Sequence, residues 1–389
     1  MKDAKKLVLF FEYFSYEHIG KDPFLVPYYL GRELGCTVTI VYPIKDDNAD
    51  MPSIINGVNL VPIQLRGDEG SNYRRRYFEF YKFLWTNAKK IDYVMKFFAD
   101  EISQEMSILY KIRNPKGKFY IKMDINPSLI PDSSTSFLQG NLIKRCIKCL
   151  IHFISLRCID VISCETTWAY DKLVCSDDCF SNWGDKLVMM PNGFDENLME
   201  EYKIEERVFA KKENLMITVG RLGTRPKNTS MLLKALEKVY MKDWKFYLIG
   251  PIEESFRNYI ELFYSRNPDK TTNVIFTGQI YDKKQLWEFY NRSKVFVLTS
   301  EWESFGLVLV EAKRFKNFLI TTPVGAAFDL TEDGHYGKII PINDSDVLAS
   351  SIQDIVDGIN NIDVYSDFDC DSLSYKRMVR IVAEKLEKL

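Results

Sequence analysis

Two glutamates eight positions apart form the strongest chemical signal in the sequence. Glu303 and Glu311 bound the segment Glu-Ser-Phe-Gly-Leu-Val-Leu-Val-Glu, which follows an apolar run. In a helix this spacing is about 2.2 turns, so the two carboxylates point only roughly the same way. Burying a carboxylate among aliphatic side chains is costly unless it is paired or hydrogen-bonded. The segment therefore indicates a site with two acidic groups, although an acidic helix N-terminus alone would explain the same pattern.

A glycine-containing basic loop is the second signal. It reads Gly220-Arg221-Leu222-Gly223-Thr224-Arg225-Pro226-Lys227-Asn228 and directly follows an apolar run. Cations at the carboxyl end of a strand can clamp a diphosphate, arginine by paired hydrogen bonds and lysine as a point charge. A solvated basic turn is the alternative, and it stays open above all for Arg225. The loop matches neither the P-loop nor the dinucleotide-binding fingerprint, which disfavours an NTPase or a dehydrogenase.

Alternating strands and helices must position these loops. The turn Pro191-Asn192-Gly193 separates two such series, and alternation of this kind is typical of parallel α/β layers. We expect strands at 6–11, 37–42, 118–123, 161–164 and 186–190, and then at 215–219, 245–249, 274–277, 295–298 and 318–321. We expect helices at 24–34, 229–239, 283–291, 306–315 and 373–389. The predicted fold is α/β, with two doubly wound Rossmann-like domains that face each other across a cleft at the carboxyl ends of their strands.

Length and composition agree with two domains. The chain has 389 residues, 46% of them hydrophobic, and a net charge of −2, which excludes a disordered or fibrous chain and exceeds one ordinary core. We place an N-terminal domain at 1–193, completed by a helix at 372–389, and a C-terminal domain at 194–371. No apolar run is long enough for a membrane span or a secretory signal. The near-neutral charge gives no support for a nucleic-acid partner, and we expect a cytoplasmic location.

The cysteines predict neither disulfides nor a metal site. In a cytoplasmic chain the eight cysteines are expected to be reduced. The pairs Cys146-x-x-Cys149 and Cys175-x-x-x-Cys179 resemble zinc-ligand spacings, but the first lies in an apolar, helix-like run where cysteine acts as a small hydrophobic residue. We therefore expect no metal and no cofactor.

The motifs together resemble the GT-B glycosyltransferases of family 4, which are retaining enzymes that use nucleotide-sugar donors. The matching pieces are Glu303-x7-Glu311, Gly220-Arg221 with Lys227-Asn228, Pro191-Asn192-Gly193-Phe194-Asp195, Phe276-Thr-Gly278 with Leu286 and Tyr290, Ser300-x-x-Glu303, and Pro323-Val-Gly325. They occur in the family's order between about residues 190 and 345. The first half resembles the family only in its layout.

The resemblance implies a role for each matched residue. Gly220, Arg221 and Lys227 would hold the donor diphosphate, and Glu303 would contact the sugar hydroxyls. Glu311 would accept hydrogen bonds from the ribose, and the backbone at Ile280 would meet the base. The backbone at Ser304, Phe305, Gly306 and Leu307 would face the phosphates at a helix N-terminus. Such preorganised positive groups stabilise a leaving diphosphate, so no metal is required. The only Asp-x-Asp pattern considered, Asp369-Cys-Asp371, lies away from these motifs.

The first half departs from the family's pattern. Residues 11–20 are aromatic-rich and hold one glycine, Gly20, where many members have a glycine pair. Asp124 ends a predicted strand, and we expect it to be the catalytic, acceptor-side polar group, with a simple turn or cap residue as the alternative. His18 in the first loop is the second candidate. The other two histidines are His152, in an apolar helix, and His335, which we expect to be structural.

A basic, apolar stretch at 141–160 predicts contact with a membrane. It carries Lys144, Arg145, Lys148 and Arg157 among aliphatic residues, as interfacial helices on anionic lipid do. The arginine-rich and aromatic segment 73–98 would help. A buried helix with basic ends is the alternative. If the membrane interpretation holds, the partner is the inner leaflet of the cytoplasmic membrane, and the acceptor is a lipid-linked saccharide.

The sequence as a whole is similar to capsule-type rhamnosyltransferases. This resemblance implies transfer of L-rhamnose from dTDP-rhamnose to a saccharide on undecaprenyl diphosphate, in capsular polysaccharide synthesis. Glu311 does not select the donor, since a deoxyribose has lost one hydroxyl that it could bind, and UDP- and GDP-sugars stay open. The rival interpretations are a sugar phosphorylase or epimerase of the same shape and a non-catalytic scaffold. A scaffold would bind no nucleotide.

Overall fold

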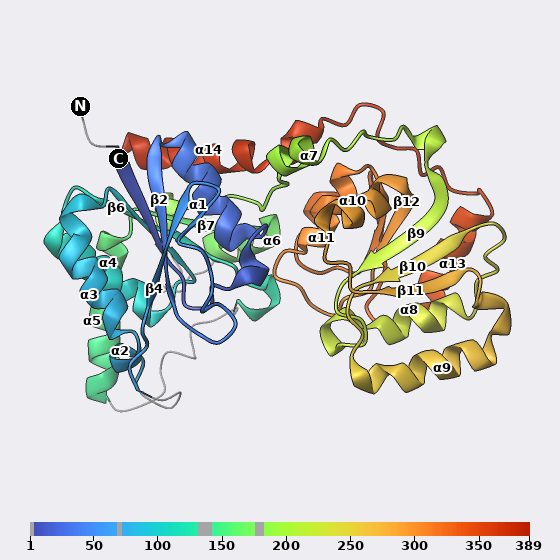
Figure 1. Ribbon diagram of the computed structural model, residues 1–389, viewed down its shortest axis with the longest axis horizontal. Coiled ribbons are helices and arrows are strands. Elements are labelled where there is room, and N and C mark those ends of the chain that lie inside the picture. Colours follow the sequence, from blue (N-terminus) through green and yellow to red (C-terminus); the bar gives the residue numbers. More distant parts are fainter. Residues whose placement is uncertain (1–3, 68–71, 131–141, 176–182) are drawn as a thin grey trace. The chain divides into compact units, whose positions relative to one another are not determined.

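The chain folds into two compact units. The computed structural model describes residues 4–67, 72–130, 142–175 and 183–389, with side chains not described at 142–145. The N-terminal unit comprises residues 1–192 and 375–389, and the C-terminal unit comprises residues 193–374. The chain thus passes between the units twice, at Asn192–Gly193 and at Ser374–Tyr375 (Figure 1).

An eight-stranded sheet forms the centre of the N-terminal unit, in the order β3-β4-β2-β1-β5-β6-β7-β8. All neighbours are parallel except β3 and β4, which form an antiparallel hairpin. The strands are β1 Lys5–Phe10, β2 Cys36–Pro43, β3 Ile54–Ile55, β4 Val58–Ile63, β5 Tyr93–Phe97, β6 Lys118–Lys122, β7 Val161–Cys164 and β8 Leu187–Met189.

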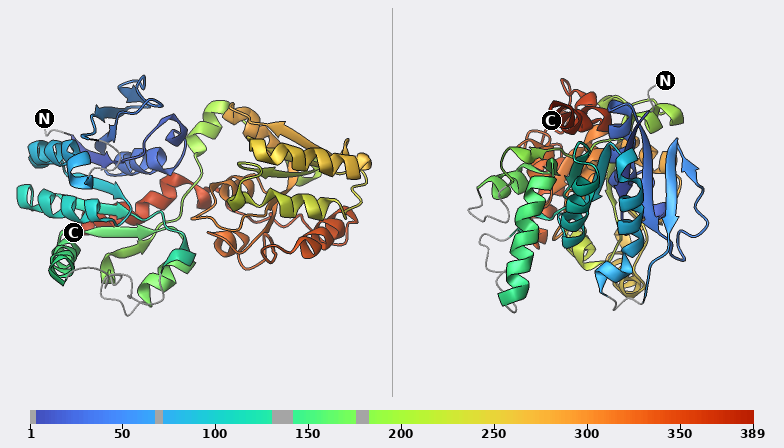
Figure 2. Two further views of the ribbon diagram at one scale, coloured as in Figure 1. Left: turned by 90° about the horizontal axis from the view of Figure 1, so that it is seen from below. Right: turned by 90° about the vertical axis from the view of Figure 1, so that its left-hand side faces the viewer.

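Helices cover both faces of this sheet. On one face α1 (Asp22–Glu33) packs against the C-terminal helix α14 (Tyr375–Lys388). The buried residues of α14 recur about every three or four positions, as an amphipathic helix requires, and they join the core under α1. They are Val379, Val382, Ala383 and Leu386. On the other face α3 (Phe78–Asn87), α4 (Glu101–Arg113) and α5 (Leu142–Cys158) lie side by side (Figure 2). The short helices α2 (Tyr73–Arg76) and α6 (Thr167–Val174) complete this layer.

A six-stranded, wholly parallel sheet forms the centre of the C-terminal unit, in the order β11-β10-β9-β12-β13-β14. The strands are β9 Glu213–Val219, β10 Lys245–Ile249, β11 Val274–Gly278, β12 Ser293–Leu298, β13 Phe318–Thr321 and β14 Gly337–Ile339. One buried core lies under α8 (Thr229–Leu236), α9 (Arg257–Arg266) and α13 (Ser345–Val356). The other lies under α7 (Glu196–Tyr202), α10 (Lys283–Arg292), α11 (Leu307–Arg314) and α12 (Ala327–Thr331).

Each sheet has one point at which the strand order reverses. From β9 the chain moves outward to β10 and β11, and β12 then returns to the other side of β9. In the N-terminal unit the same reversal separates β1 from β5. Ligands of open α/β sheets bind beyond the carboxyl ends of the strands at such a point. The loops after β9 and β12, and those after β1 and β5, are therefore the ones to examine.

The predicted fold class is confirmed, because both units contain Rossmann-like, doubly wound α/β sheets. The predicted strands 161–164, 245–249 and 318–321 have the observed bounds, and most others differ by one or two residues. One end was wrong by three residues, since helix 229–239 ends at Leu236. The sequence analysis also omitted the strands β3, β4, β5 and β14 and the helices α2, α3, α4, α6, α7, α9, α12 and α13.

Candidate functional site

Two loops meet where the strand order of the C-terminal unit reverses. One follows β9 at residues 220–228, and the other follows β12 at residues 299–306. The backbone N–H of Glu301 donates to the carbonyl of Pro226 at 2.8 Å, and the Thr299 hydroxyl donates to the carbonyl of Lys227 at 3.1 Å. These bonds fix the basic loop against the loop that carries Glu303.

Lys227 and Glu303 form an ion pair across these two loops. Their side chains are 20% and 16% exposed, so the pair is shielded but still reaches solvent. The Ser300 hydroxyl donates to the same carboxylate oxygen, Oε1, at 2.7 Å. Both sequence-predicted residues are thus brought together, with an ammonium and a carboxylate in direct contact.

Glycines allow the close approach of these loops. A Cβ atom on Gly220 would lie 3.3 Å from Cε of Lys227, whose side chain therefore runs over that glycine. A Cβ atom on Gly250, at the end of β10, would lie only 1.9 Å from the Gly220 carbonyl oxygen. Gly250 also has φ of +139°, a conformation that other residues rarely adopt. A side chain at Gly250 would displace the loop that presents Lys227.

The other two cations of the loop are more exposed. Arg225 is 90% exposed in its side chain and lies 3.6 Å from Glu301, in keeping with a solvated turn. Arg221 is exposed, and no ion pair of its guanidinium is found among the residues that the structure describes. Arg221 is therefore the cation of this loop that is ready to accept an anionic ligand.

The N-terminus of α11 lies in the same loop cluster. Gly306 precedes the helix with φ of +94°, and no side chain caps the helix there. The first N–H groups of a helix have no intrahelical partner and favour anions. The turn at Pro323–Gly325 supports this end, since Ala326 N–H donates to the Phe305 carbonyl at 2.9 Å. The backbone from Ser304 to Leu307 is thus held in place, with N–H groups available for a ligand.

Glu311 lies in α11 with a partner that the sequence analysis missed. Its Oε1 pairs with the ammonium of Lys283, and the indole N–H of Trp287 donates to the same oxygen at 3.2 Å. Lys283 and Trp287 are one turn apart on α10, and Trp287 is buried. Ile280 lies in the loop between β11 and α10, three residues before Lys283. Lys283 thus connects the loop predicted to meet the base with the carboxylate predicted to bind the ribose.

A buried charged cluster at the carboxyl ends of β6 and β7 was also missed. Lys122 of β6 is fully buried and pairs with Glu165 after β7 and with Asp22 at the start of α1. The Asn192 side chain donates to Glu165 Oε1 at 2.9 Å. Burial raises the pKa of Glu165, and the Lys122 ammonium opposes that shift. A second buried pair, Lys96 with Glu12, lies at β5. A lysine inside an apolar strand was the sequence signal for both pairs.

The two predicted acceptor-side residues lie in the N-terminal unit. Asp124 is partly exposed just after β6, and its charge is one of those that raise the pKa of Lys122 against the effect of burial. His18 follows β1, and its Nδ1 accepts from the backbone N–H of Ser15 at 3.1 Å. Burial lowers the His18 pKa. The neutral ring therefore carries its proton on Nε2 and can donate to a ligand there.

Helix α5 presents an exposed apolar face. Ile147, Leu150, Phe153 and Ile154 are between 38% and 59% exposed, at positions that recur along one side of the helix. Lys148 pairs with Glu101 at 2.7 Å, and Arg157 stacks on Phe153. The side chains of Lys144 and Arg145 lie outside the described residues. No helix in the described part of the chain is long and apolar enough to span a bilayer.

The cysteine prediction was partly wrong. Cys146 and Cys149 are exposed on α5, as are the apolar side chains of Leu150 and Phe153 beside them, rather than buried as small hydrophobic residues. Cys179 lies outside the described residues. Within the described ranges no cluster of three or more His, Cys, Asp or Glu side chains has the arrangement of a metal site. Asp369 instead caps a short helix by accepting from the Asp371 N–H at 3.1 Å.

The C-terminal unit matches a known family. Residues 199–361 match the model described as "Glycosyl transferases group 1". The amylovoran biosynthesis glycosyltransferase AmsD of Erwinia amylovora is 32% identical over 108 residues, which are 28% of this chain and 29% of AmsD. The capsular polysaccharide biosynthesis glycosyltransferase CapM of Staphylococcus aureus is 28% identical over 171 residues, 42% of each chain. The matched segments span less than half the length of these curated relatives.

Solved structures resemble the whole chain. A glycosyltransferase from Rickettsia africae has a TM-score of 0.68 at 16% identity, over 99% of this chain and 98% of that one. Anabaena HepE, solved in complex with UDP, has a TM-score of 0.63 at 14% identity, over 99% of this chain and 100% of that one. Such identities show the fold alone. The chain thus has the fold of the GT-B glycosyltransferases, and its residues 199–361 match the group 1 glycosyltransferase family.

Proposed function

We propose that this protein is a glycosyltransferase that binds a nucleotide diphosphate sugar on its C-terminal unit. The observation that carries the proposal is the Lys227–Glu303 pair, held where the strand order reverses and beside the N-terminus of α11. Exposed Arg221 and the backbone N–H groups at 305–307 add positive charge on that side. The family match, which contains all these residues, supports the assignment.

The proposed reaction transfers the sugar from phosphate to a hydroxyl group. The bond between sugar C1 and the β-phosphate oxygen breaks, a bond forms between C1 and the acceptor oxygen, and the hydroxyl proton is released with the nucleoside diphosphate. Negative charge develops on the departing diphosphate, so fixed cations and helix N–H groups stabilise the transition state more than the substrate. In this proposal Lys227 and Arg221 meet the diphosphate, Glu303 meets the sugar hydroxyls, and Asp124 or His18 meets the acceptor. No metal ion is needed, and the retained anomeric configuration is carried over from the family.

The proposed pathway is the synthesis of a cell-surface polysaccharide. AmsD and CapM, by their names, act in amylovoran and capsular polysaccharide biosynthesis, and we extend that class to this chain. We propose a saccharide on undecaprenyl diphosphate as the acceptor. L-Rhamnose from dTDP-rhamnose is the first donor to test. UDP-sugars are the second, since HepE was solved with UDP and with UDP-glucose.

The function is tested by incubating the protein with dTDP-rhamnose, UDP-glucose, UDP-galactose and GDP-mannose in turn. Release of the nucleoside diphosphate is followed with and without a bacterial lipid extract that contains saccharide acceptors. We expect one donor to be consumed far faster than the others, and faster still with the extract. Binding of a nucleotide without consumption of any donor would contradict the transferase, and failure to bind any nucleotide would favour a scaffold.

The Lys283–Glu311 pair leads to a prediction about ribose. Lys283 and Trp287 both contact Oε1 of Glu311 and so orient the carboxylate, which in this proposal accepts from a ribose hydroxyl. We expect Lys283→Met to leave the carboxylate without a fixed orientation and to reduce the preference for UDP over 2′-deoxy-UDP by about tenfold, the lower end of the range for a hydrogen bond to a charged group. Calorimetric titration of both nucleotides measures this ratio, with Lys284→Met, at the next position of α10, as the control. An unchanged ratio with weaker binding of both nucleotides would contradict it.

The exposed face of α5 leads to a prediction about membranes. We propose that this face lies on the inner leaflet of the cytoplasmic membrane, where Ile147, Leu150 and Phe153 enter the lipid while Lys148 and Arg157 meet anionic headgroups. Vesicles containing phosphatidylglycerol should then protect Cys146 and Cys149, which are exposed on the same helix, from maleimide. Exposed Cys175, on a different helix end, serves as the internal control. Equal protection by neutral phosphatidylcholine vesicles, or none by either, would contradict the proposal.

A further inference from the structure

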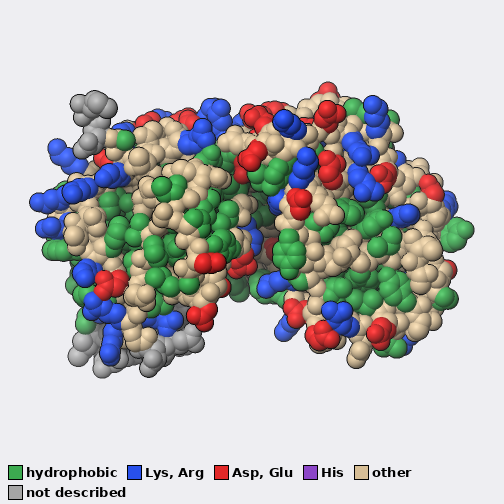
Figure 3. Space-filling model, viewed as in Figure 1, with side chains coloured by type: hydrophobic (Ala, Val, Ile, Leu, Met, Phe, Trp, Pro, Cys, Tyr) green, Lys and Arg blue, Asp and Glu red, His purple; other side chains and the backbone are tan. Residues whose placement is uncertain are grey.

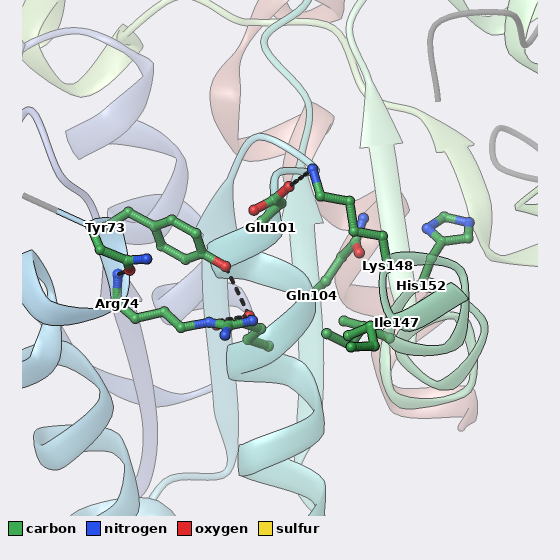
Figure 4. Close-up of a pocket in the computed structure, with 10 residues that line it drawn as sticks. Tyr73, Arg74, Glu101, Gln104, Ile147, Lys148 and His152 are labelled. Atoms are coloured by element: carbon green, nitrogen blue, oxygen red, sulfur yellow. Dashed lines mark hydrogen bonds and ion pairs between the residues drawn. The ribbon is translucent and has the colours of Figure 1, made fainter. Parts of the chain in front are cut away.

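A cavity of about 340 Å³ lies in the N-terminal unit between α2, α4 and α5 (Figure 4). Figure 4 shows Tyr73 and Arg74 on one side of it, and Ile147, Lys148 and His152 of α5 on the other. Its base is the first two turns of α4, the helix that follows the carboxyl end of β5. The volume is at the lower end of the range for small-molecule sites, about 300–1,000 Å³.

The α2 side of the cavity is rigid and keeps its cation in place. Glu105 Oε1 accepts from the Tyr73 hydroxyl at 2.8 Å and from Arg74 Nε at 2.8 Å. Glu105 Oε2 accepts from the Tyr81 hydroxyl at 2.9 Å. The carboxylate is thus saturated with donors and neutralised by Arg74, whose side chain is still 57% exposed. Nε and Nη2 of Arg74 both donate to Glu105, which leaves Nη1 as the group that can meet a ligand.

The α5 side is apolar and opens onto the exposed face of that helix. Ile147 and Ile151 line the cavity one turn apart. Ile147 is 50% exposed and continues, through Leu150 and Ile154, into the apolar face described above. A hydrocarbon chain lying on that face therefore has a continuous apolar path into the cavity.

The mouth of the cavity carries a replaceable ion pair. Lys148 and Glu101 pair at 2.7 Å, with side chains 61% and 50% exposed. Exposed pairs of this kind contribute only about 0–1 kcal/mol, so Lys148 can exchange Glu101 for a more highly charged anion. Arg74 and Lys148 thus line the cavity together with the carboxylates of Glu101 and Glu105. Figure 3 shows Lys and Arg side chains gathered at this end of the unit, where Figure 1 places α2.

We propose that this cavity binds a single-chain lipid phosphate, with the chain between Ile147 and Ile151 and the phosphate at Arg74 and Lys148. The small volume suits one hydrocarbon chain rather than the two of a membrane phospholipid. This inference deepens the proposed function. It depends on that function only for the source of the ligand, which would be the lipid phosphate of the acceptor. It differs from the membrane proposal, since a helix face lying on lipid needs no cavity.

Geranyl phosphate, a short single-chain lipid phosphate, is the probe. It is titrated below its aggregation concentration by calorimetry, beside inorganic phosphate, geraniol and dihexanoyl phosphatidic acid. Because both the chain and the phosphate have contacts, we expect geranyl phosphate to bind at least about tenfold more tightly than each of the other three. Ile151→Trp, which fills the cavity, and Lys148→Gln should each weaken binding about tenfold.

Matched variants separate the cavity from general stickiness and from misfolding. Ile112→Trp places the same bulk on the exposed surface of α4 outside the cavity lining, and Lys82→Gln removes a lysine that is also 61% exposed and ion-paired. Both should bind geranyl phosphate as the wild type does. Stabilisation by the nucleoside diphosphate, measured on the same samples, tests the C-terminal unit separately. If the nucleotide binds but geranyl phosphate does not, the cavity proposal is wrong and the donor assignment is unaffected. The same conclusion follows if geranyl phosphate binds Ile151→Trp as tightly as the wild type.

Discussion

Lys227→Ala is expected to lower turnover of the preferred nucleotide diphosphate sugar by a factor of about 10²–10³, the loss usually seen when one preorganised donor to a developing anion is removed. Lys227 lies at the reversal point, its side chain fixed over Gly220 and its carbonyl bonded to Thr299. A fixed ammonium needs no rearrangement as charge develops on the diphosphate. The loss should therefore appear mainly in kcat and in binding of the free nucleoside diphosphate, which carries the charge that develops in the reaction, with a smaller effect on binding of the intact donor.

A matched control lies two residues away. Arg225→Ala removes a cation from the same loop, but Arg225 is 90% exposed and 3.6 Å from its partner, so turnover should change less than about threefold. Lys227→Ala also leaves the Glu303 carboxylate, 16% exposed, without its ammonium. Lys227→Met keeps the length of the side chain and checks that the loss is one of charge. Equal losses in Lys227→Ala and Arg225→Ala would contradict a specific role for Lys227.

Lys122→Met is expected to destabilise the N-terminal unit by about 3–5 kcal/mol, the usual cost of removing one partner from a buried ion pair. Lys122 is fully buried, and the carboxylates of Glu165 and Asp22 contact its ammonium. Without it, two acidic groups remain in a largely buried site, where the Asn192 side chain still donates to Glu165. Lys118→Met, on the same strand but partly exposed, should cost less than about 1 kcal/mol.

A double variant identifies the cause. In Lys122→Met with Glu165→Leu, most of the uncompensated charge is gone, so the loss should be clearly smaller than in Lys122→Met alone. The free energy of unfolding is measured in urea by amide hydrogen exchange at β6, which reports on the N-terminal unit alone. A signal from one unit is needed because a chain of two units need not unfold in one step. If the double variant lost as much as the sum of the two single variants, the two groups would not be coupled, and the cluster would not act as an ion pair.

The sequence predicted those contacts of the site that follow from the order of the strands, but not those that depend on how helices pack against each other. The Lys227 loop and the Glu303 segment each follow a strand, and the carboxyl ends of neighbouring parallel strands meet at one edge, so their proximity could be inferred. Lys283 could not be found in this way, because its contact with Glu311 depends on how α10 packs beside α11. The helical spacing of Lys283 and Trp287 shows only that they share a face of α10.

The elements that were missed have a similar explanation. Tyr93–Phe97 is a five-residue strand interrupted by Lys96, which an apolar pattern does not tolerate unless the lysine is paired. Its partner Glu12 lies 84 positions earlier in the chain, so only the folded sheet reveals the pair. The cysteines of α5 led to the opposite error. An apolar run suggests a buried helix, and only the folded structure shows that Cys146 and Cys149 are exposed.

The most direct test of the account is a thermal-shift measurement with UDP, GDP, ADP and dTDP on the wild type and on Lys227→Ala. At 100 times its Kd a bound nucleotide adds about 2.7 kcal/mol to the stability of the folded state. The account predicts that one nucleotide raises the melting temperature of the wild type and does so much less in Lys227→Ala, and a preference for dTDP would support rhamnose as the sugar. Failure of all four to stabilise the wild type would contradict a donor site on the C-terminal unit.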